Sequence, residues 1–182
     1  ADDLHRSLNL VIVGGGLEQP TPEEKMVLGQ LDDVCARIPR ARDGLVLLGH
    51  RANHEVAMML RIAQAGLGSL VAARGVYACT SQKEEFGVAL LEAMATGLAV
   101  VAPNSGGPAT YVQEGLTGSL ADTSSLADVR EALRRAATAR ADEPRAQRTS
   151  NLVRSHYTIE AMATSLAGVY ADVVREPAQV AA

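Results

Sequence analysis

Short apolar runs alternate with longer helix-patterned segments along most of this chain, and that alternation limits the possible folds more than any other feature. Five runs are predicted to be strands: 9–13, 45–49, 75–79, 99–102 and 118–120. Helices are predicted at 22–38, 53–65, 88–96, 126–137, 143–155 and 159–174, with a short helix that begins near Pro108. Regular alternation of strands and helices favours an α/β fold, in which a Rossmann-like parallel sheet carries helices on both faces.

The composition indicates the kind of core and excludes some partners. With 182 residues, of which 47% are hydrophobic and 3% aromatic, the chain is long enough for one domain with a core of Ala, Val, Leu and Ile. The formal net charge of −4 argues against a nucleic-acid partner, since such proteins present a basic face. The arginines between Arg134 and Arg148 are interrupted by acids and alanines, and they predict a solvated helix face.

Three features favour a cytoplasmic protein. Cys35 and Cys79 are predicted to be buried free thiols, as expected in a reducing compartment. No apolar stretch is long enough to span a membrane. The first residues, 1–5, have no signal-peptide character.

The loop after the predicted strand 75–79 is a candidate site, because ligands of open α/β sheets bind outside the carboxyl ends of the strands. This loop is polar and acidic, and the next predicted helix opens at Gly87. Backbone N–H groups at that helix start, around 86–89, are suited to binding phosphate. Gly87 has no side chain, so a ligand can approach its backbone closely.

Two glutamates flank the helix start, Glu84 just before it and Glu92 within it. A carboxylate among residues as apolar as 90–95 costs free energy unless something pairs with it. From Gly87 to Glu92 the helix rises on the order of 7 Å. These positions suit a ligand with phosphates at the helix start, a sugar near Glu84 and the paired hydroxyls of a ribose near Glu92. The alternative for Glu92 is a structural role, as a cap or as the partner of an arginine on a neighbouring helix.

Two weaker patterns would indicate other kinds of site. Gly14 and Gly16 follow a predicted strand, as in dinucleotide-binding loops, but Gln19 stands where the third glycine is needed. His50 and His54 have the i, i+4 spacing of metal ligands, without a third ligand nearby in the sequence. We therefore predict neither a dinucleotide cofactor nor a metal site.

The segment around the two glutamates resembles a family signature. It matches the pattern of retaining GT-B glycosyltransferases with an E-x7-E motif, which here reads Glu84-x-Phe86-Gly87-x4-Glu92-Ala93-Met94-Ala95-x-Gly97. That family includes sucrose-phosphate synthase, sucrose synthase and many bacterial hexosyltransferases. Further matches lie at 10–15, 46–50, 99–103, 106–109 and 115–118, and the likeness covers nearly all of residues 8–174.

The resemblance implies that the chain is the C-terminal, donor-binding half of such an enzyme. Residues 1–157 would form the Rossmann-like donor domain, and 158–182 the helix that crosses between the two domains in the family, followed by a tail. The enzyme would transfer a hexosyl group from a nucleotide-diphosphate sugar, by family habit a UDP-sugar. Transfer would retain the configuration at the anomeric carbon and would need no metal ion or other cofactor.

The resemblance also implies a role for each matching residue. Glu84 would be the catalytic residue that faces the donor sugar, and Glu92 would bind the ribose. The other implied donor-binding residues are Phe86, Gly87 and Val88 for the sugar and phosphate, Gly49 and His50 for the base, and Gly14 and Gly15 for the diphosphate.

Part of the family pattern is expected to precede Ala1. The first strand of the donor domain, with an arginine and a lysine that bind the diphosphate, would lie there, as would the N-terminal acceptor domain. We therefore expect the isolated chain to be inactive and to expose a sheet edge through which it can form homo-oligomers. The alternative is a non-catalytic module that binds nucleotide-sugars or completes a partner chain.

Overall fold

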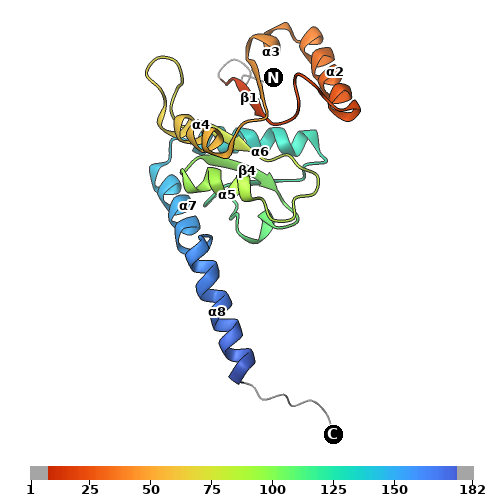
Figure 1. Ribbon diagram of the computed structural model, residues 1–182. Coiled ribbons are helices and arrows are strands. Elements are labelled where there is room, and N and C mark those ends of the chain that lie inside the picture. The colour runs from red at the N-terminus through yellow and green to blue at the C-terminus, as the bar shows by residue number, and fades with distance from the viewer. Residues whose placement is uncertain (1–7, 176–182) are drawn as a thin grey trace. The chain divides into compact units, whose positions relative to one another are not determined.

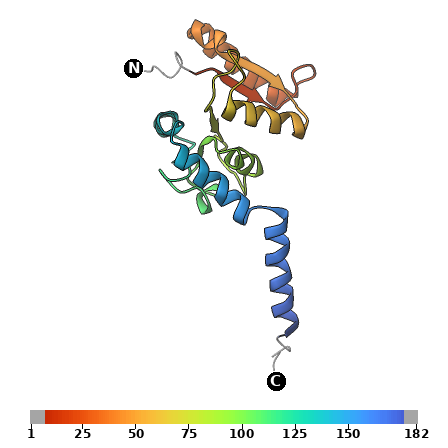
Figure 2. The ribbon, with the colours of Figure 1, turned by 90° about the vertical axis from the view of Figure 1, so that its left-hand side faces the viewer.

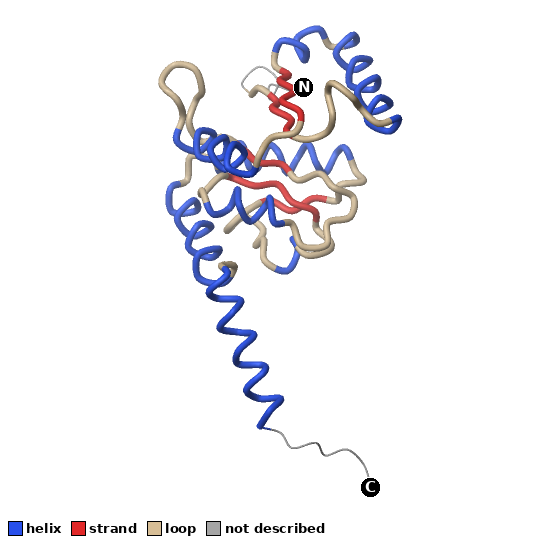
Figure 3. The backbone as a smooth tube through the Cα atoms, in the orientation of Figure 1, coloured by secondary structure: helices blue, strands red, loops and turns tan. Residues whose placement is uncertain are grey.

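The computed structural model describes residues 8–175, and the ends of the two predicted domains, 1–7 and 176–182, lie outside the described residues. Within this range Figure 3 distinguishes the helices from the strands. In chain order the elements are β1 (Leu10–Val13), α2 (Pro22–Arg37), α3 (Pro39–Asp43), β2 (Leu45–Gly49), α4 (Asn53–Ala65), β3 (Val76–Ala78), α5 (Val88–Ala95), β4 (Ala99–Pro103), the 3-10 helix η1 (Pro108–Thr110), β5 (Ser119–Ala121), α6 (Leu126–Ala139), α7 (Glu143–His156) and α8 (Ile159–Arg175).

All strand pairs among the described residues are parallel, which confirms the predicted α/β class. The hydrogen bonds divide these strands between a two-stranded parallel sheet, β1-β2, and a three-stranded parallel sheet, β3-β4-β5. The chain likewise divides into two compact units, with the boundary between Met59 and Leu60. Each unit is described by itself.

In the first unit, β1 pairs with β2 with Leu10 opposite Leu45. The following helix, α2, begins where the sequence predicts it, because Thr21 caps it and Pro22 occupies its first turn. The Thr21 hydroxyl accepts a hydrogen bond from the Glu24 N–H, and the Glu24 carboxylate accepts one from the Thr21 N–H at 2.8 Å. This reciprocal pair satisfies two N–H groups that the helix itself leaves without partners.

In the second unit, β4 lies between β3 and β5, and all five of its residues are buried. Ala99 and Val101 pack in one cluster with Ala121 of β5 and with Ala132 and Ala136 of α6. Because side chains alternate along a strand, Val100 and Ala102 face the other way. Figure 1 shows α5 and α6 on opposite sides of β4, so helices cover both faces of this sheet as predicted.

The two C-terminal helices, α7 and α8, differ in how many of their residues are buried. α7 buries Thr149 and Val153, whereas α8, which follows it as a separate helix in Figure 2, buries none of its residues. The exposed apolar side chains of α8 recur at helical spacing, at Ile159, Met162, Leu166, Val169, Tyr170 and Val173. No helix within the described range is both long and apolar enough to cross a membrane.

Candidate functional site

The candidate site is the loop that joins β3 to α5, residues 79–87. Its first residue extends the sheet, since the Cys79 N–H donates to the Val101 carbonyl at 2.9 Å. Its last residue, Gly87, is the N-cap of α5 and has a left-handed backbone with φ 85°. The loop therefore connects the carboxyl end of a strand to the amino end of a helix, as the sequence predicts.

The structure shows a different reason for a glycine at position 87 from the predicted one, which was the close approach of a ligand. Gly87 is buried, and a Cβ there would lie 2.7 Å from the hydroxyl oxygen of Tyr111. The space beside its Cα is thus filled by another residue of the chain. Together with the positive φ, this contact requires glycine at the position before any ligand is considered.

Two further glycines, Gly106 and Gly107, pack against the backbone of the loop. The Gly107 N–H donates to the Glu84 carbonyl at 3.1 Å. A Cβ on Gly106 would overlap the Glu84 carbonyl oxygen, and one on Gly107 would lie 2.6 Å from the Phe86 Cα. Because these glycines have no side chains, the two backbone segments can come into contact. This contact fixes the position of the loop that carries Glu84.

We expect Gly107→Ala to destabilise the fold by about 2 kcal/mol, because the added methyl group forces the Phe86 backbone to move. Denaturant unfolding of the purified chain measures this loss. Gly168→Ala is the matched control: it lies within α8, and a Cβ there meets no atom within 4 Å. The control is expected to be neutral or slightly stabilising. Equal stability of the two variants would contradict the described contact.

The Glu84 carboxylate is half-buried, and its Oε2 lies 3.8 Å from the Cys79 Sγ. The Cys79 thiol is equally close to the Ser81 hydroxyl, at 3.8 Å. Both cysteines of the chain are free, as predicted, but only Cys35 is buried. Cys79 is partly exposed because it lies in the loop beside Glu84 rather than in the core.

Glu92 does not carry the burial cost that its neighbours in the sequence suggest. It is exposed, while Leu90, Leu91, Ala93 and Met94 are buried, because it occupies the solvent side of α5. None of the ion pairs found among the described residues includes Glu92. The arginine pairing considered as an alternative is therefore not observed in this part of the chain.

Tyr77 of β3 is partly buried. Burial raises the pKa of its phenol to about 12, and the negative charges of Cys79, Glu84 and Glu92 act in the same direction.

Three of the chain's five aromatic residues meet at the end of this loop, a cluster that sequence reasoning missed. Ring centroids are 6.1 Å apart for Phe86 and Tyr111, and 5.4 Å apart for Tyr111 and Tyr157. Phe86 is half exposed, while Tyr111 is 3% exposed. Aromatic residues are rare in this chain. That rarity was the signal that could have pointed to them as candidates for such a cluster.

The predicted donor-binding residues of the first unit lie at the carboxyl ends of β1 and β2. The Gly14 N–H donates to the Gly49 carbonyl at 2.8 Å, so these two glycines are adjacent. Gly14, Gly15 and Gly49 all have positive φ, and His50, the residue after Gly49, is exposed.

The glycine-rich turn at 14–16 already binds a carboxylate of this chain, that of Glu24. The Gly16 N–H donates to the Glu24 Oε1 at 2.9 Å, and a Cβ on Gly15 would lie 3.3 Å from the same oxygen. Hydrogen bonds from the Thr21 and Gly16 N–H groups lower the pKa of Glu24 and so favour its charged form. Gly14 and Gly15 remain predicted diphosphate contacts, but the Gly16 N–H is occupied.

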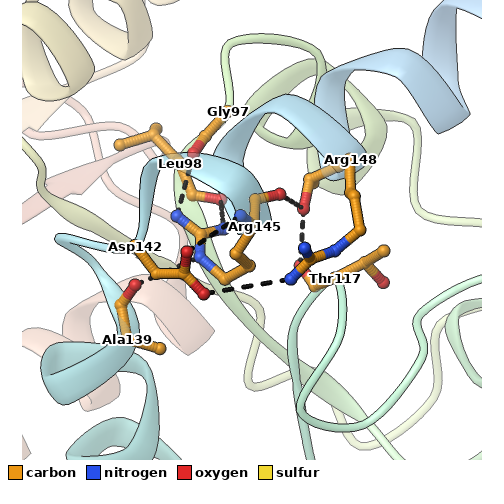
Figure 4. Close-up of polar contacts among 8 residues, drawn as sticks. Gly97, Leu98, Thr117, Ala139, Asp142, Arg145 and Arg148 are labelled. Atoms are coloured by element: carbon orange, nitrogen blue, oxygen red, sulfur yellow. Dashed lines mark hydrogen bonds and ion pairs between the residues drawn. The ribbon is translucent and has the colours of Figure 1, made fainter.

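Arg145 corrects the prediction of a solvated arginine face between 134 and 148. Its side chain is 2% exposed, and its guanidinium donates to the carbonyls of Gly97, Leu98 and Ala139 at 3.1–3.2 Å. Figure 4 shows this group reaching from α7 toward the end of α5, whereas Arg148 turns toward Asp142. Arg145 therefore fixes the turn between β4 and α5, the helix whose first residues form the candidate site.

Comparisons with known proteins identify the family of the chain. The family model for glycosyl transferases group 1 matches residues 45–154. D-inositol 3-phosphate glycosyltransferase from Stackebrandtia nassauensis is 32% identical over 183 residues, which is 97% of this chain and 36% of the relative. A probable sucrose-phosphate synthase from Thermosipho melanesiensis is 44% identical over 50 residues, 28% of this chain and 12% of the relative.

Two solved structures show the same fold. Sucrose-phosphate synthase from Thermosynechococcus elongatus superposes with a TM-score of 0.71 at 22% identity, over 91% of this chain and 38% of that one. Anabaena Alr3699/HepE, solved in complex with UDP, gives 0.56 at 23% identity, over 87% of this chain and 41% of that one. The chain thus matches well under half the length of each of these four proteins.

Proposed function

Because the chain belongs to the glycosyl transferases group 1 family, we propose that it is the donor-binding portion of a retaining hexosyltransferase that uses a UDP-sugar. The observation that carries this proposal is the arrangement around α5. A half-buried carboxylate, Glu84, lies before the amino end of the helix, and an exposed one, Glu92, lies farther along it.

The proposed ligand spans this arrangement. Its diphosphate binds at the amino end of α5, where N–H groups and the helix dipole favour negative charge. Its hexose extends toward Glu84, and its ribose hydroxyls bind Glu92, which lies on the order of 7 Å farther along the helix. Phe86, Gly87 and Val88 contribute backbone groups.

The proposed reaction breaks the bond between the anomeric carbon and the diphosphate and forms one to an acceptor oxygen on the same face of the sugar. The acceptor hydroxyl loses its proton to the departing phosphate. Negative charge grows on that phosphate as the bond breaks, and the N–H groups at the start of α5 stabilise it. We propose that these groups supply the stabilisation without a metal ion.

We propose that the acceptor is bound by a part of the enzyme outside this chain. The relatives support this, since the chain matches only 36% of the length of the Stackebrandtia glycosyltransferase. The exposed apolar stripe of α8 supports it as well, because such a stripe is suited to packing against another surface. In this proposal the complete enzyme acts in the cytoplasm.

Calorimetric titration of the chain with UDP, GDP and ADP tests the proposal. We expect binding of UDP, with a Kd about tenfold higher for Glu92→Ala, because that variant loses a hydrogen bond between a charged group and the ribose.

Glu131→Ala is the matched control, since Glu131 is an exposed glutamate on α6 of the same unit. It is expected to bind UDP like the unmodified chain. Equal affinity of the Glu92 and control variants would refute the ribose assignment, and failure of all three nucleotides to bind would refute the donor site.

A further inference from the structure

The Tyr111 hydroxyl bonds to the backbone of the candidate site rather than to another side chain. It donates to the Phe86 carbonyl at 2.6 Å and lies 3.3 Å from the Gly87 carbonyl. The Gly87 carbonyl also accepts from the N–H groups of Leu90 and Leu91, at 3.0 and 3.1 Å, and so begins the hydrogen bonding of α5. The phenol therefore contacts the last two peptide units before the helix.

Fixing these carbonyls also fixes two N–H groups. A peptide unit is planar and trans, so its N–H points opposite to its C=O. The Phe86 carbonyl belongs to the same unit as the Gly87 N–H, and the Gly87 carbonyl to the same unit as the Val88 N–H. With both carbonyls held by Tyr111 and by the first turn of α5, the two N–H groups are directed away from Tyr111.

The surroundings of Tyr111 keep the phenol in place as a donor. Its ring packs edge-on against Phe86 and, with centroids 5.4 Å apart, against Tyr157. Burial raises the pKa of the phenol above its ordinary value, and the charges of Cys79 and Glu84 add to the effect. A phenol is protonated at neutral pH even at its ordinary pKa, so the hydroxyl can donate to a carbonyl.

We propose that Tyr111 is a positioning residue that aims the Gly87 and Val88 N–H groups at the diphosphate of the donor without touching the donor itself. The inference rests on the proposed function, because it is that function which places a diphosphate at the start of α5. The inference adds Tyr111 to the site. Its role follows from its contacts with the loop and not from the E-x7-E signature.

The test compares Tyr111→Phe with Tyr157→Phe. The first removes only the hydroxyl that holds the two carbonyls, and the second removes a hydroxyl from the same aromatic cluster while leaving those bonds intact. UDP and UMP are the probes, because they differ by the phosphate that the N–H groups are proposed to bind. Calorimetry measures UDP binding, and NMR titration of the labelled chain measures UMP binding.

We expect Tyr111→Phe to raise the Kd for UDP about fivefold to tenfold and to change the Kd for UMP less than about twofold. Tyr157→Phe should change neither. An unchanged Kd for UDP in Tyr111→Phe would overturn the proposal, as would equal losses for UDP and UMP, which indicate general loosening of the fold. If the unmodified chain binds neither nucleotide, the proposed function fails and the role of Tyr111 fails with it.

A second measurement does not depend on how the variant folds. In the NMR spectrum of the unmodified chain, saturating UDP should shift the amide resonances of Gly87 and Val88 more than UMP does. Binding of UDP without movement of these two resonances would overturn the assignment of Tyr111 and would mean that the diphosphate binds away from the start of α5.

Discussion

Glu84→Ala in the complete enzyme is expected to lower the transfer rate by a factor of about a hundred to a thousand. The same variant should change the Kd for UDP by less than about twofold. The reason is that in the proposed site the carboxylate faces the reacting sugar, whereas the nucleotide binds elsewhere on α5. The loop itself should survive the substitution, since Gly107 holds it through the Glu84 backbone carbonyl and not through the side chain. Steady-state transfer assays and nucleotide titration measure the two effects.

Glu85→Ala is the matched control. Glu85 is the next residue of the same loop, but its side chain is 80% exposed and forms a surface ion pair with Lys83 at 2.9 Å. Such pairs contribute little, so this variant should transfer at close to the normal rate. Unchanged turnover in Glu84→Ala would refute the catalytic assignment, and a large loss of UDP affinity would show instead that Glu84 binds the nucleotide.

Local signals in the sequence predicted most of the elements. The bounds of β2, Leu45–Gly49, and of α4, Asn53–Ala65, agree with the prediction, because an apolar run that ends in glycine and a long helical pattern need no distant partner. α3 was missed, since a helix of five residues is too short to show a helical period. The signature around Glu84 and Glu92 likewise led to the correct family.

Contacts between distant residues escaped prediction. Gly106 and Gly107 were recognised as part of a pattern, but their close approach to the backbone from Glu84 to Phe86 follows only from folding. The bond from Tyr111 to Phe86 joins residues 25 positions apart, and no local pattern specifies such a pair. Glu92 shows the same limit: its neighbours in sequence are apolar, yet the helix turns them inward and leaves Glu92 exposed.

Arg145→Met is expected to destabilise the second unit by about 3 kcal/mol, because three carbonyls of the interior lose their donor at once. The arginine was read as solvated from its polar neighbours, while its acceptors Gly97 and Leu98 lie 48 and 47 positions away in the sequence. Methionine nearly matches its length but offers no N–H group. For a chain of this size the loss corresponds to a fall in Tm of roughly 6–12 °C, which calorimetry or circular dichroism measures.

Arg148→Met separates this effect from the loss of any arginine on α7. The Arg148 side chain is 49% exposed, and its contact with the Asp142 carboxylate is 3.8 Å long, so its removal should cost less than about 0.5 kcal/mol. Equal destabilisation by the two variants would contradict the buried role of Arg145. Since Arg145 holds the turn after α5 and not the first residues of the helix, the Arg145→Met variant should bind UDP like the unmodified chain at temperatures well below its Tm. A loss of affinity under those conditions would mean that both ends of the helix must be held for the donor site to form.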